Sequence, residues 1–194
     1  MDPFTANKYY AKKKLLKLFG GEVRIYDESR TNLLFFVKQK AFKLKEDITV
    51  FADESQSRPL LKIQARSILD FGTTYDVTDV VTNQKVGAIR RKLLKSILRD
   101  EWAILDASDK EFGTVSEDSM LMALLRRFLS NLIPQHFAMT VGGTQVGDLK
   151  QTWNPFVPQF NVDFSMDSGR LDRRLGIAAV VLLQVIEGKQ SSMD

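Results

Sequence analysis

The sequence predicts a closed antiparallel β-barrel, mainly β with some α, built around a buried hydrophobic C-terminal helix. Residues 175–186 (LGIAAVVLLQVI) are apolar on every face except at Gln184. A helix of that kind must be surrounded by the rest of the protein. Before it lie about eleven short strand patterns separated by polar turns, and closing such a sheet removes its exposed edges. Crossing a bilayer takes about 20 apolar residues, so a run of about a dozen favours a core helix.

Length and composition limit the possible classes of protein. The chain has 194 residues, a formal net charge of +4 and no cysteine, which excludes disulfides, thiolate metal sites and a thiol nucleophile. The N-terminus shows no long apolar segment typical of a signal peptide, so a cytoplasmic location is expected. We expect a basic helical arm at residues 1–21, the barrel domain at residues 22–188 and a disordered tail at residues 189–194.

The elements are predicted in chain order. Residues 7–19 (NKYYAKKKLLKLF) are interpreted as a short basic helix that ends at Gly20 and Gly21. The predicted strands are residues 23–26, 33–39, 47–51, 60–64, 75–79, 86–90, 101–105, 112–115, 137–141, 146–150 and 160–164.

An internal repeat of strand, polar turn and strand runs through the chain. Aspartates recur at strand ends, where a carboxylate can bind backbone N–H groups two residues on. Glycines recur just inside the returning strands, where they often mark a bulge or a close backbone approach. The aspartates are Asp27, Asp53, Asp79 and Asp106, and the glycines are Gly87, Gly113 and Gly147.

Two helices are predicted in the second half of the chain. Asp118 is expected to cap an amphipathic helix that packs outside the barrel, on an apolar face formed by Leu121, Leu124, Leu125, Phe128, Leu129 and Leu132. For the central helix, Asp167 and Ser168 are the predicted N-caps, and Gly188 is the predicted residue after its C-terminus.

Several segments resemble the tubby-C-terminal-like superfamily, in its phospholipid scramblase and LURP-one-related branch. They are residues 86–96 (VGAIRRKLLKS), residues 102–106 (WAILD), residues 147–155 (GDLKQTWNP) and residues 160–164 (FNVDF), followed by the apolar helix. The resemblance covers about residues 23–186. It implies twelve antiparallel strands around the C-terminal helix. This agrees with the barrel predicted above from the strand patterns and the apolar helix.

The sequence departs from the scramblases at one functional segment. Scramblases carry an acidic calcium-ligating stretch here, whereas residues 154–159 (NPFVPQ) contain no carboxylate. Calcium is held by several oxygen ligands, carboxylates among them. The palmitoylated cysteines of scramblases also have no counterpart. We therefore expect no metal and no cofactor.

No pattern of catalytic residues can be assembled from the chain, so an enzyme is not expected. His136 is the only histidine, stands next to Gln135 and Pro134, and is predicted to be structural or exposed. Asp163, Asp167 and Asp172 straddle the junction between the last strand and the helix. Capping is favoured there over metal binding.

Two acid-free basic clusters remain as candidate binding residues. The first basic cluster is Lys8, Lys12, Lys13, Lys14 and Lys17, and the second is Arg90, Arg91, Lys92, Lys95 and Arg99. Solvated surface charge is one interpretation. The other is an anionic membrane surface, because each such cation contributes about 1 kcal/mol near an anionic leaflet. The candidate lipid contacts are Lys12, Lys13, Lys14, Lys17, Arg90, Arg91, Lys92 and Lys95.

The expected function is a non-enzymatic peripheral membrane or phospholipid-binding module, monomeric, cytoplasmic and positioned at the inner face of a membrane. Tubby-like domains bind phosphoinositides through basic side chains, but their ligand residues do not map onto this sequence. A calcium-independent scramblase and a soluble barrel that binds a protein partner or small ligand are the alternatives. Nucleic acid is not expected as a partner, because no recognised binding motif accompanies the basic residues.

Overall fold

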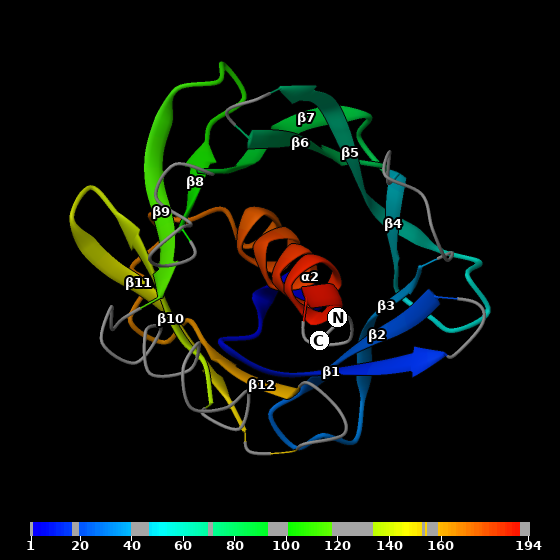
Figure 1. The fold of residues 1–194 in the computed structure, drawn as a ribbon. Coiled ribbons are helices and arrows are strands. Elements are labelled where there is room, and N and C mark those ends of the chain that lie inside the picture. Colours follow the sequence, from blue (N-terminus) through cyan, green and yellow to red (C-terminus); the bar gives the residue numbers. More distant parts are fainter. Residues whose placement is uncertain are drawn as a thin grey trace.

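Twelve antiparallel strands form a closed barrel around one C-terminal helix (Figure 1). The computed structural model describes residues 2–16, 20–39, 47–69, 72–92, 101–117, 134–152, 154 and 159–190. Within the barrel each strand pairs with its neighbours in sequence, and β1 closes the ring against β12. The predicted fold class is therefore confirmed.

The strands follow one another around the barrel as a continuous antiparallel meander. They are η1 (Pro3–Thr5), β1 (Lys8–Leu16), β2 (Gly20–Asp27), β3 (Leu33–Gln39), β4 (Asp47–Phe51), β5 (Pro59–Leu69), β6 (Gly72–Asp79), β7 (Gln84–Arg91), β8 (Glu101–Leu105), β9 (Glu111–Glu117), β10 (His136–Val141), β11 (Thr144–Gln151), β12 (Gln159–Asp163) and α2 (Arg173–Gln190).

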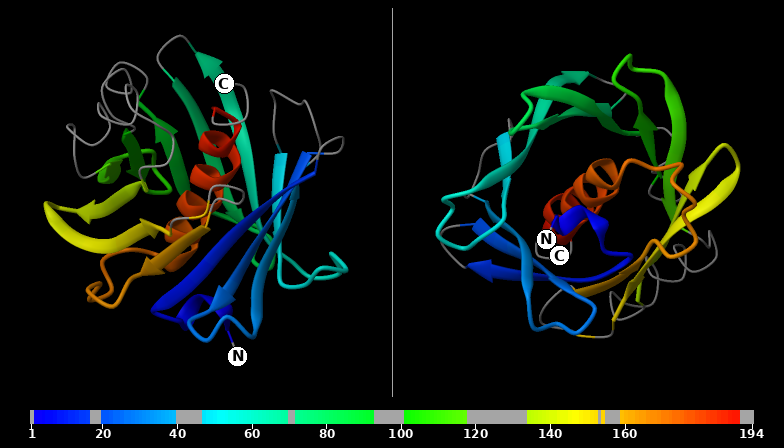
Figure 2. Two further views of the ribbon diagram at one scale, coloured as in Figure 1. Left: turned by 60° about the horizontal axis from the view of Figure 1, so that its bottom comes forward. Right: turned by 180° about the vertical axis from the view of Figure 1, so that it is seen from behind.

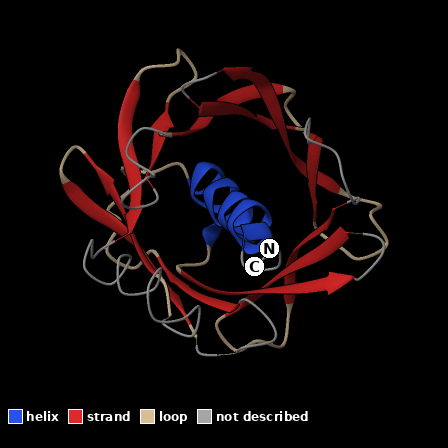
Figure 3. Cartoon of the chain, viewed as in Figure 1, coloured by secondary structure: helices blue, strands red, loops and turns tan. Residues whose placement is uncertain are grey.

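Helix α2 occupies the interior of the barrel, as three views of the chain show (Figures 2 and 3). Every residue from 175 to 185 is buried, Gln184 included at 1% exposure. Inward-facing strand residues such as Val77, Ile89 and Phe137 complete the core around it. Among the described residues no helix is both long enough and apolar enough to cross a membrane.

The repeated glycines sit beside β-bulges, as predicted. The pairing register shifts next to Gly87, Gly113 and Gly147, and the residue before each glycine is the extra one. Gly87 also permits a close approach. A Cβ atom built on it would lie 2.3 Å from the Leu105 carbonyl oxygen and 3.1 Å from Leu175 Cδ1 of the helix. Only glycine fits between these two neighbours.

The repeated aspartates shape the turns at one end of the barrel. Asp27 Oδ1 accepts hydrogen bonds from the Thr31 and Asn32 amides at 3.1 and 3.3 Å. Asp53, Asp79 and Asp106 act in the same way in the next three turns. These turns hold four residues at positive φ, namely Arg30, Gln56, Asn83 and Asp109. We call this the turn end, and α2 begins there. The opposite end, where α2 ends, is called the C-terminal end.

The predicted N-terminal helix is wrong, because Lys8–Leu16 form strand β1. Tyr9, Ala11 and Lys13 are buried, while Lys12 and Lys14 are exposed, which is the two-residue period of a strand. The strand pairs with both β2 and β12. The barrel therefore starts at Lys8 rather than at residue 22, and the described residues before it contain the short 3-10 helix η1 in place of a basic helical arm.

The ends of α2 also differ from the prediction. Asp172 is the N-terminal cap: its Oδ1 accepts from the Arg174 amide at 2.9 Å and its carbonyl from the Leu175 amide at 3.0 Å. Asp167 instead binds the Arg170 amide in the turn before the helix. The helix continues past Gly188 to Gln190, two residues into the predicted tail. Residues 191–194 and the amphipathic helix expected after Asp118 lie outside the described residues.

Replacing Val181 by Asp tests whether α2 is a core element. Val181 is fully buried, so the new carboxylate would be unpaired in an apolar interior. We expect a loss of more than about 4 kcal/mol of unfolding free energy, measured by urea denaturation followed by circular dichroism. Val81→Asp is the matched control, since Val81 is 80% exposed, and should change stability by less than about 0.5 kcal/mol. A Val181→Asp protein as stable as the control would contradict the central-helix fold.

Candidate functional site

Strand β1 divides the first basic cluster between the two faces of the barrel wall. Lys13 points inward and is 1% exposed. Its ammonium donates to the Gln184 carbonyl oxygen at 2.8 Å and lies 3.5 Å from that of Val185. A cation is favourable near the C-terminal part of a helix, where carbonyl groups give a partial negative charge. Lys13 therefore holds α2 against β1, and its prediction as a lipid contact is wrong.

Lys12 and Lys14 point outward and are exposed. In the β1–β2 ladder they stand opposite Arg24 and Glu22. Arg24 occupies the nearby carboxylates, binding Glu22 at 2.8 Å and Glu54 at 2.7 Å. With no ion pair of their own to any described residue, Lys12 and Lys14 remain available to an external anion. We call these two side chains the β1 lysine pair.

Arg24 is locked by its surroundings. Its guanidinium carbon lies 5.2 Å from the centroid of the Phe36 ring, in a cation–π contact. The hydrogen bond from Arg24 lowers the pKa of Glu54, which keeps that carboxylate charged and in place. Arg24 is consequently a support beside the β1 lysine pair rather than a free cation. The two other members of the first basic cluster lie elsewhere: Lys8 binds Glu28 at 2.9 Å at the turn end, and Lys17 is outside the described residues.

The second basic cluster is compensated by carboxylates. Arg90 binds Glu111 at 3.1 Å, and Lys92 binds Glu111 at 2.5 Å and Glu101 at 3.2 Å. Burial acts to lower the pKa of Lys92, but the hydrogen bonds to Glu111 and Glu101 outweigh it and raise that pKa overall. An external anion would have to compete with these pairs.

Arg91 lies on the opposite face of β7 from Arg90, and its guanidinium carbon is 5.7 Å from the ring centroid of buried Trp102. Lys95 and Arg99 are outside the described residues. The structure therefore does not bring the predicted candidates together. Lys12 and Lys14 are exposed and form no ion pair with a described residue, Arg90 and Lys92 are ion-paired, and Lys13 and Arg91 face inward.

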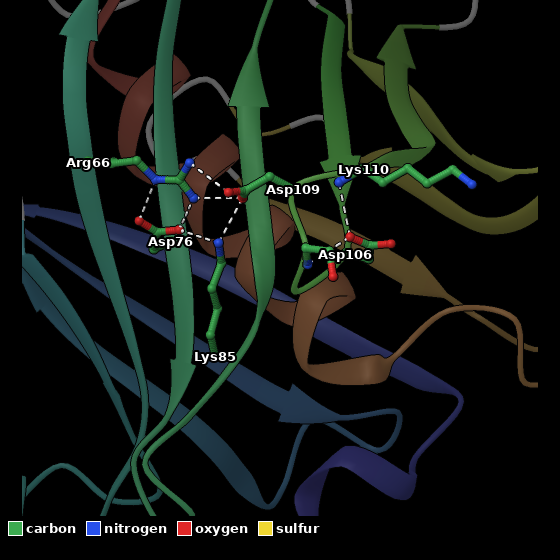
Figure 4. A network of polar contacts seen from close by, with 7 residues as sticks. Arg66, Asp76, Lys85, Asp106, Asp109 and Lys110 are labelled. Carbon is green, nitrogen blue, oxygen red and sulfur yellow. Dashed lines mark hydrogen bonds and ion pairs between the residues drawn. The ribbon is translucent and has the colours of Figure 1, made fainter.

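A four-residue charge network on the outer wall escaped the sequence analysis (Figure 4). Arg66 on β5 donates to Asp109 at 2.7 and 3.0 Å and forms two hydrogen bonds with Asp76 on β6. Lys85 on β7 binds the same two carboxylates at 2.7 and 3.3 Å. The network ties three strands to the β8–β9 turn. Arg66 lies 43 residues before Asp109 in the chain, so no local sequence pattern reveals this pairing.

This network is suited to structure rather than to proton transfer. Hydrogen bonds from Arg66 and then Lys85 lower the pKa of Asp109 to about 2. The same two cations also hold the pKa of Asp76 below its usual value, against the opposing effect of burial. Carboxylates held ionised in this way are poor general acids near neutral pH. Two positive and two negative groups leave the network without net charge.

His136 and Asp148 form a smaller pair on the outer face of β10 and β11. His136 Nε2 is hydrogen-bonded to Asp148 Oδ1, and Lys150 binds the other oxygen of that carboxylate at 2.9 Å. Burial acts to raise the pKa of Asp148, but the hydrogen bonds from His136 and Lys150 lower it overall. The cluster links two neighbouring strands, as expected of a structural histidine.

The acidic residues at the strand-to-helix junction bind backbone amides. Asp163 accepts from the Ser165 amide at 2.7 Å, and Asp167 and Asp172 hold the turns described above. Within the ranges that the structure describes, no three His, Asp or Glu side chains are grouped to hold a metal ion. Of residues 154–159, only Asn154 and Gln159 are described, so the absence of a calcium site stays a prediction.

The closed barrel around a central helix is the fold that the resemblance to tubby-like proteins implied, and a family comparison makes the assignment. The family model described as LURP-one-related matches residues 33–184. The chain therefore belongs to the LURP-one-related family, a member of the tubby-like and scramblase superfamily. Comparisons with curated proteins and with solved structures gave no match.

Changing Lys13 and Lys12 separately to Glu tests the division of β1. Lys13→Glu would place a carboxylate against the helix carbonyls, and we expect a loss of about 3–5 kcal/mol in unfolding free energy. Lys12→Glu should change it by less than about 0.5 kcal/mol, because the side chain is exposed. Urea denaturation measures both. Equal effects from the two neighbours would refute the inward orientation of Lys13.

The Asp109 network predicts a pH-dependent stability. Because the pKa of Asp109 is about 2 in the folded protein against 3.8 ordinarily, its stabilisation is present above about pH 4 and is lost as pH falls toward 2. Asp109→Asn keeps a residue type that tolerates the positive φ of 66° but removes the charge. We expect this variant to unfold at a lower temperature than the wild type at pH 7. The gap should narrow between about pH 4 and 2; a gap that widens there would contradict the assignment.

Proposed function

We propose that this protein is a non-enzymatic module that binds anionic membrane surfaces peripherally, through the β1 lysine pair and the C-terminal end of the barrel. The observation that carries the proposal is the contrast in charge compensation. Arg24, Arg90 and Lys92 each bind carboxylates, whereas Lys12 and Lys14 are exposed and form no ion pair within the described chain. Free cations attract an anionic leaflet without first giving up a partner.

The position of the lysine pair favours the C-terminal end. Strand β1 runs from the turn end toward the C-terminal end, and Lys14 is close to its last residue, Leu16. In the sequence, the segments between β1 and β2, β3 and β4, β5 and β6, β7 and β8, β9 and β10, and β11 and β12 together hold Leu, Ile, Phe and Met with more cations than carboxylates. Apolar and basic residues together suit the membrane interface. The turns of the opposite end carry the aspartates.

The expected affinity is modest. Each cation near an anionic surface contributes about 1 kcal/mol, so Lys12 and Lys14 together supply about 2 kcal/mol, or roughly a 30-fold change in partitioning. Attraction of this size is reversible and sensitive to salt, because ions shorten the range of the field. The protein would associate with a membrane peripherally rather than anchor in it.

Co-sedimentation with lipid vesicles tests the proposal. We expect the protein to bind vesicles of phosphatidylcholine mixed with phosphatidylserine at low salt. It should bind neither pure phosphatidylcholine nor acidic vesicles at about 1 M salt, where the Debye length is about 3 Å. Replacing Lys12 and Lys14 by Gln together should weaken binding about 30-fold.

The matched control removes two cations from the turn end, by changing Lys110 and Arg170 to Gln. That variant has the same net charge as the Lys12 and Lys14 double variant and should bind nearly as well as the wild type. Arg90→Gln should have a smaller effect than Lys12→Gln, because Glu111 already occupies Arg90. Indifference of the wild type to acidic vesicles at low salt would overturn the proposal, as would equal losses in the two double variants.

A further inference from the structure

The side chain of Arg30 lies on the outer wall of the barrel, although the residue belongs to the β2–β3 turn. Its guanidinium carbon is 4.2 Å from the centroid of the Tyr10 ring on β1, in a cation–π contact. Its Nη2 donates to Asn161 Oδ1 on β12 at 3.3 Å. Arg30 is exposed and forms no ion pair with a described residue. A guanidinium carries five N–H donors, so most of those of Arg30 remain open to an external acceptor.

The β2–β3 turn does not require arginine at this position. Arg30 is the third residue after Asp27 and has a φ of 62°. In the β4–β5 turn, Gln56 holds the same place after Asp53, with a φ of 59°. Glutamine therefore suits this backbone conformation as well, and the turn alone does not account for the charge of Arg30.

Arg30 extends the β1 lysine pair into a row of three cations. Tyr10, Lys12 and Lys14 are alternate residues of β1, so their side chains leave the same, outer face at intervals of about 6.8 Å. Because the guanidinium of Arg30 lies over the Tyr10 ring, its charge takes the first place in this row. We call Arg30, Lys12 and Lys14 the β1 cation stripe.

The carboxylates beside the stripe are engaged by other cations. Glu22 stands opposite Lys14, and Arg24 binds its carboxylate at 2.8 Å. Toward the turn end, the next outward residue of β1 is Lys8, which binds Glu28 at 2.9 Å. The stripe is thus limited to four residue steps of β1, a length of about 14 Å.

An extended peptide presents side chains with the same spacing. Those on one face recur at every second residue, about 6.8 Å apart, so acids at the first, third and fifth positions reach all three cations. A run of adjacent acids would direct every second carboxylate away from the wall. Charges that match in position as well as in sign give selectivity between partners.

We infer that the β1 cation stripe is a docking site for an extended segment of a partner protein that carries an acidic residue at every second position. The segment lies along the outer face of β1 and is held by side-chain contacts, so no strand of the barrel has to open. The inference does not rest on the proposed membrane function. A bound segment would nevertheless occupy the β1 lysine pair and compete with an acidic membrane for it.

An NMR titration with the peptide acetyl-Glu-Ser-Glu-Ser-Glu-amide tests the stripe. At low salt we expect shifts of the backbone amides of residues 10–14 and of Arg30 at peptide concentrations up to about 1 mM. The peptide acetyl-Ser-Glu-Glu-Glu-Ser-amide has the same composition and charge, but only two of its acids can face the stripe. It should bind roughly threefold more weakly, and Arg30→Gln should weaken the first peptide by about fivefold, the upper value for an exposed ion pair.

Arg58→Gln is the matched control, because Arg58 lies in the β4–β5 turn, is 73% exposed and binds Asp53 of its own turn at 3.7 Å. It removes the same charge and should leave peptide binding unchanged. Circular dichroism confirms that each variant is folded. The inference is overturned if no β1 amide shifts at about 1 mM peptide. Equal binding of the two peptides, or equal losses in the two arginine variants, would also overturn it.

Vesicle binding of the same variants separates this inference from the proposed membrane function. We expect Arg30→Gln to bind acidic vesicles as the wild type does, because Arg30 belongs to the turn end. A loss of vesicle binding in Arg30→Gln without a loss of peptide binding would make the stripe a membrane contact and overturn the inference. Peptide binding by a wild-type protein that ignores acidic vesicles would support the inference and overturn only the membrane proposal.

Discussion

The burial of α2 is the constraint on which the rest of the structure depends. A helix that is apolar all round cannot rest on a single surface, so the sheet must close around it. Closure of the sheet requires strand β1 to pair with β12. It also requires the barrel wall to approach helix α2 closely, which happens at Gly87. Lys13 completes the arrangement by binding helix carbonyls from the wall. Lys13 is therefore buried in the core, whereas its neighbours Lys12 and Lys14 lie on the surface.

The same geometry separates the two ends of the barrel. At the turn end, aspartate side chains accept hydrogen bonds from backbone amides of their own turns. The N-terminus of α2, capped by Asp172, lies at the same end. The C-terminal end of the barrel holds the last residues of α2 and of β1. Ion pairing varies around the wall as well, from the closed network of Arg66, Asp76, Lys85 and Asp109 to the β1 lysine pair, which forms no ion pair with a described residue. Lysines without an ion pair are where an anionic partner meets least competition.

The sequence predicted the barrel, the buried helix and the turn chemistry because periodicity and turn residues are local signals. It misassigned residues 8–16 as helix, since an inward-pointing Lys13 among outward lysines hides the alternation of a strand. The candidate site was only partly predictable for a related reason. Whether a cation is free depends on carboxylates far away in sequence, such as Glu111 beside Arg90 or Asp109 beside Arg66, and no local pattern reveals those pairs.

The orientation of the barrel on a membrane is the most direct test of this account. Paramagnetic broadening of backbone amides can be measured by NMR with acidic vesicles that carry a gadolinium-chelating lipid. The account predicts strong broadening at Lys12, Lys14 and neighbouring β2 residues, with little at the turns that begin at Asp53 and Asp106. Broadening centred on those turns, or spread evenly over both ends, would contradict it.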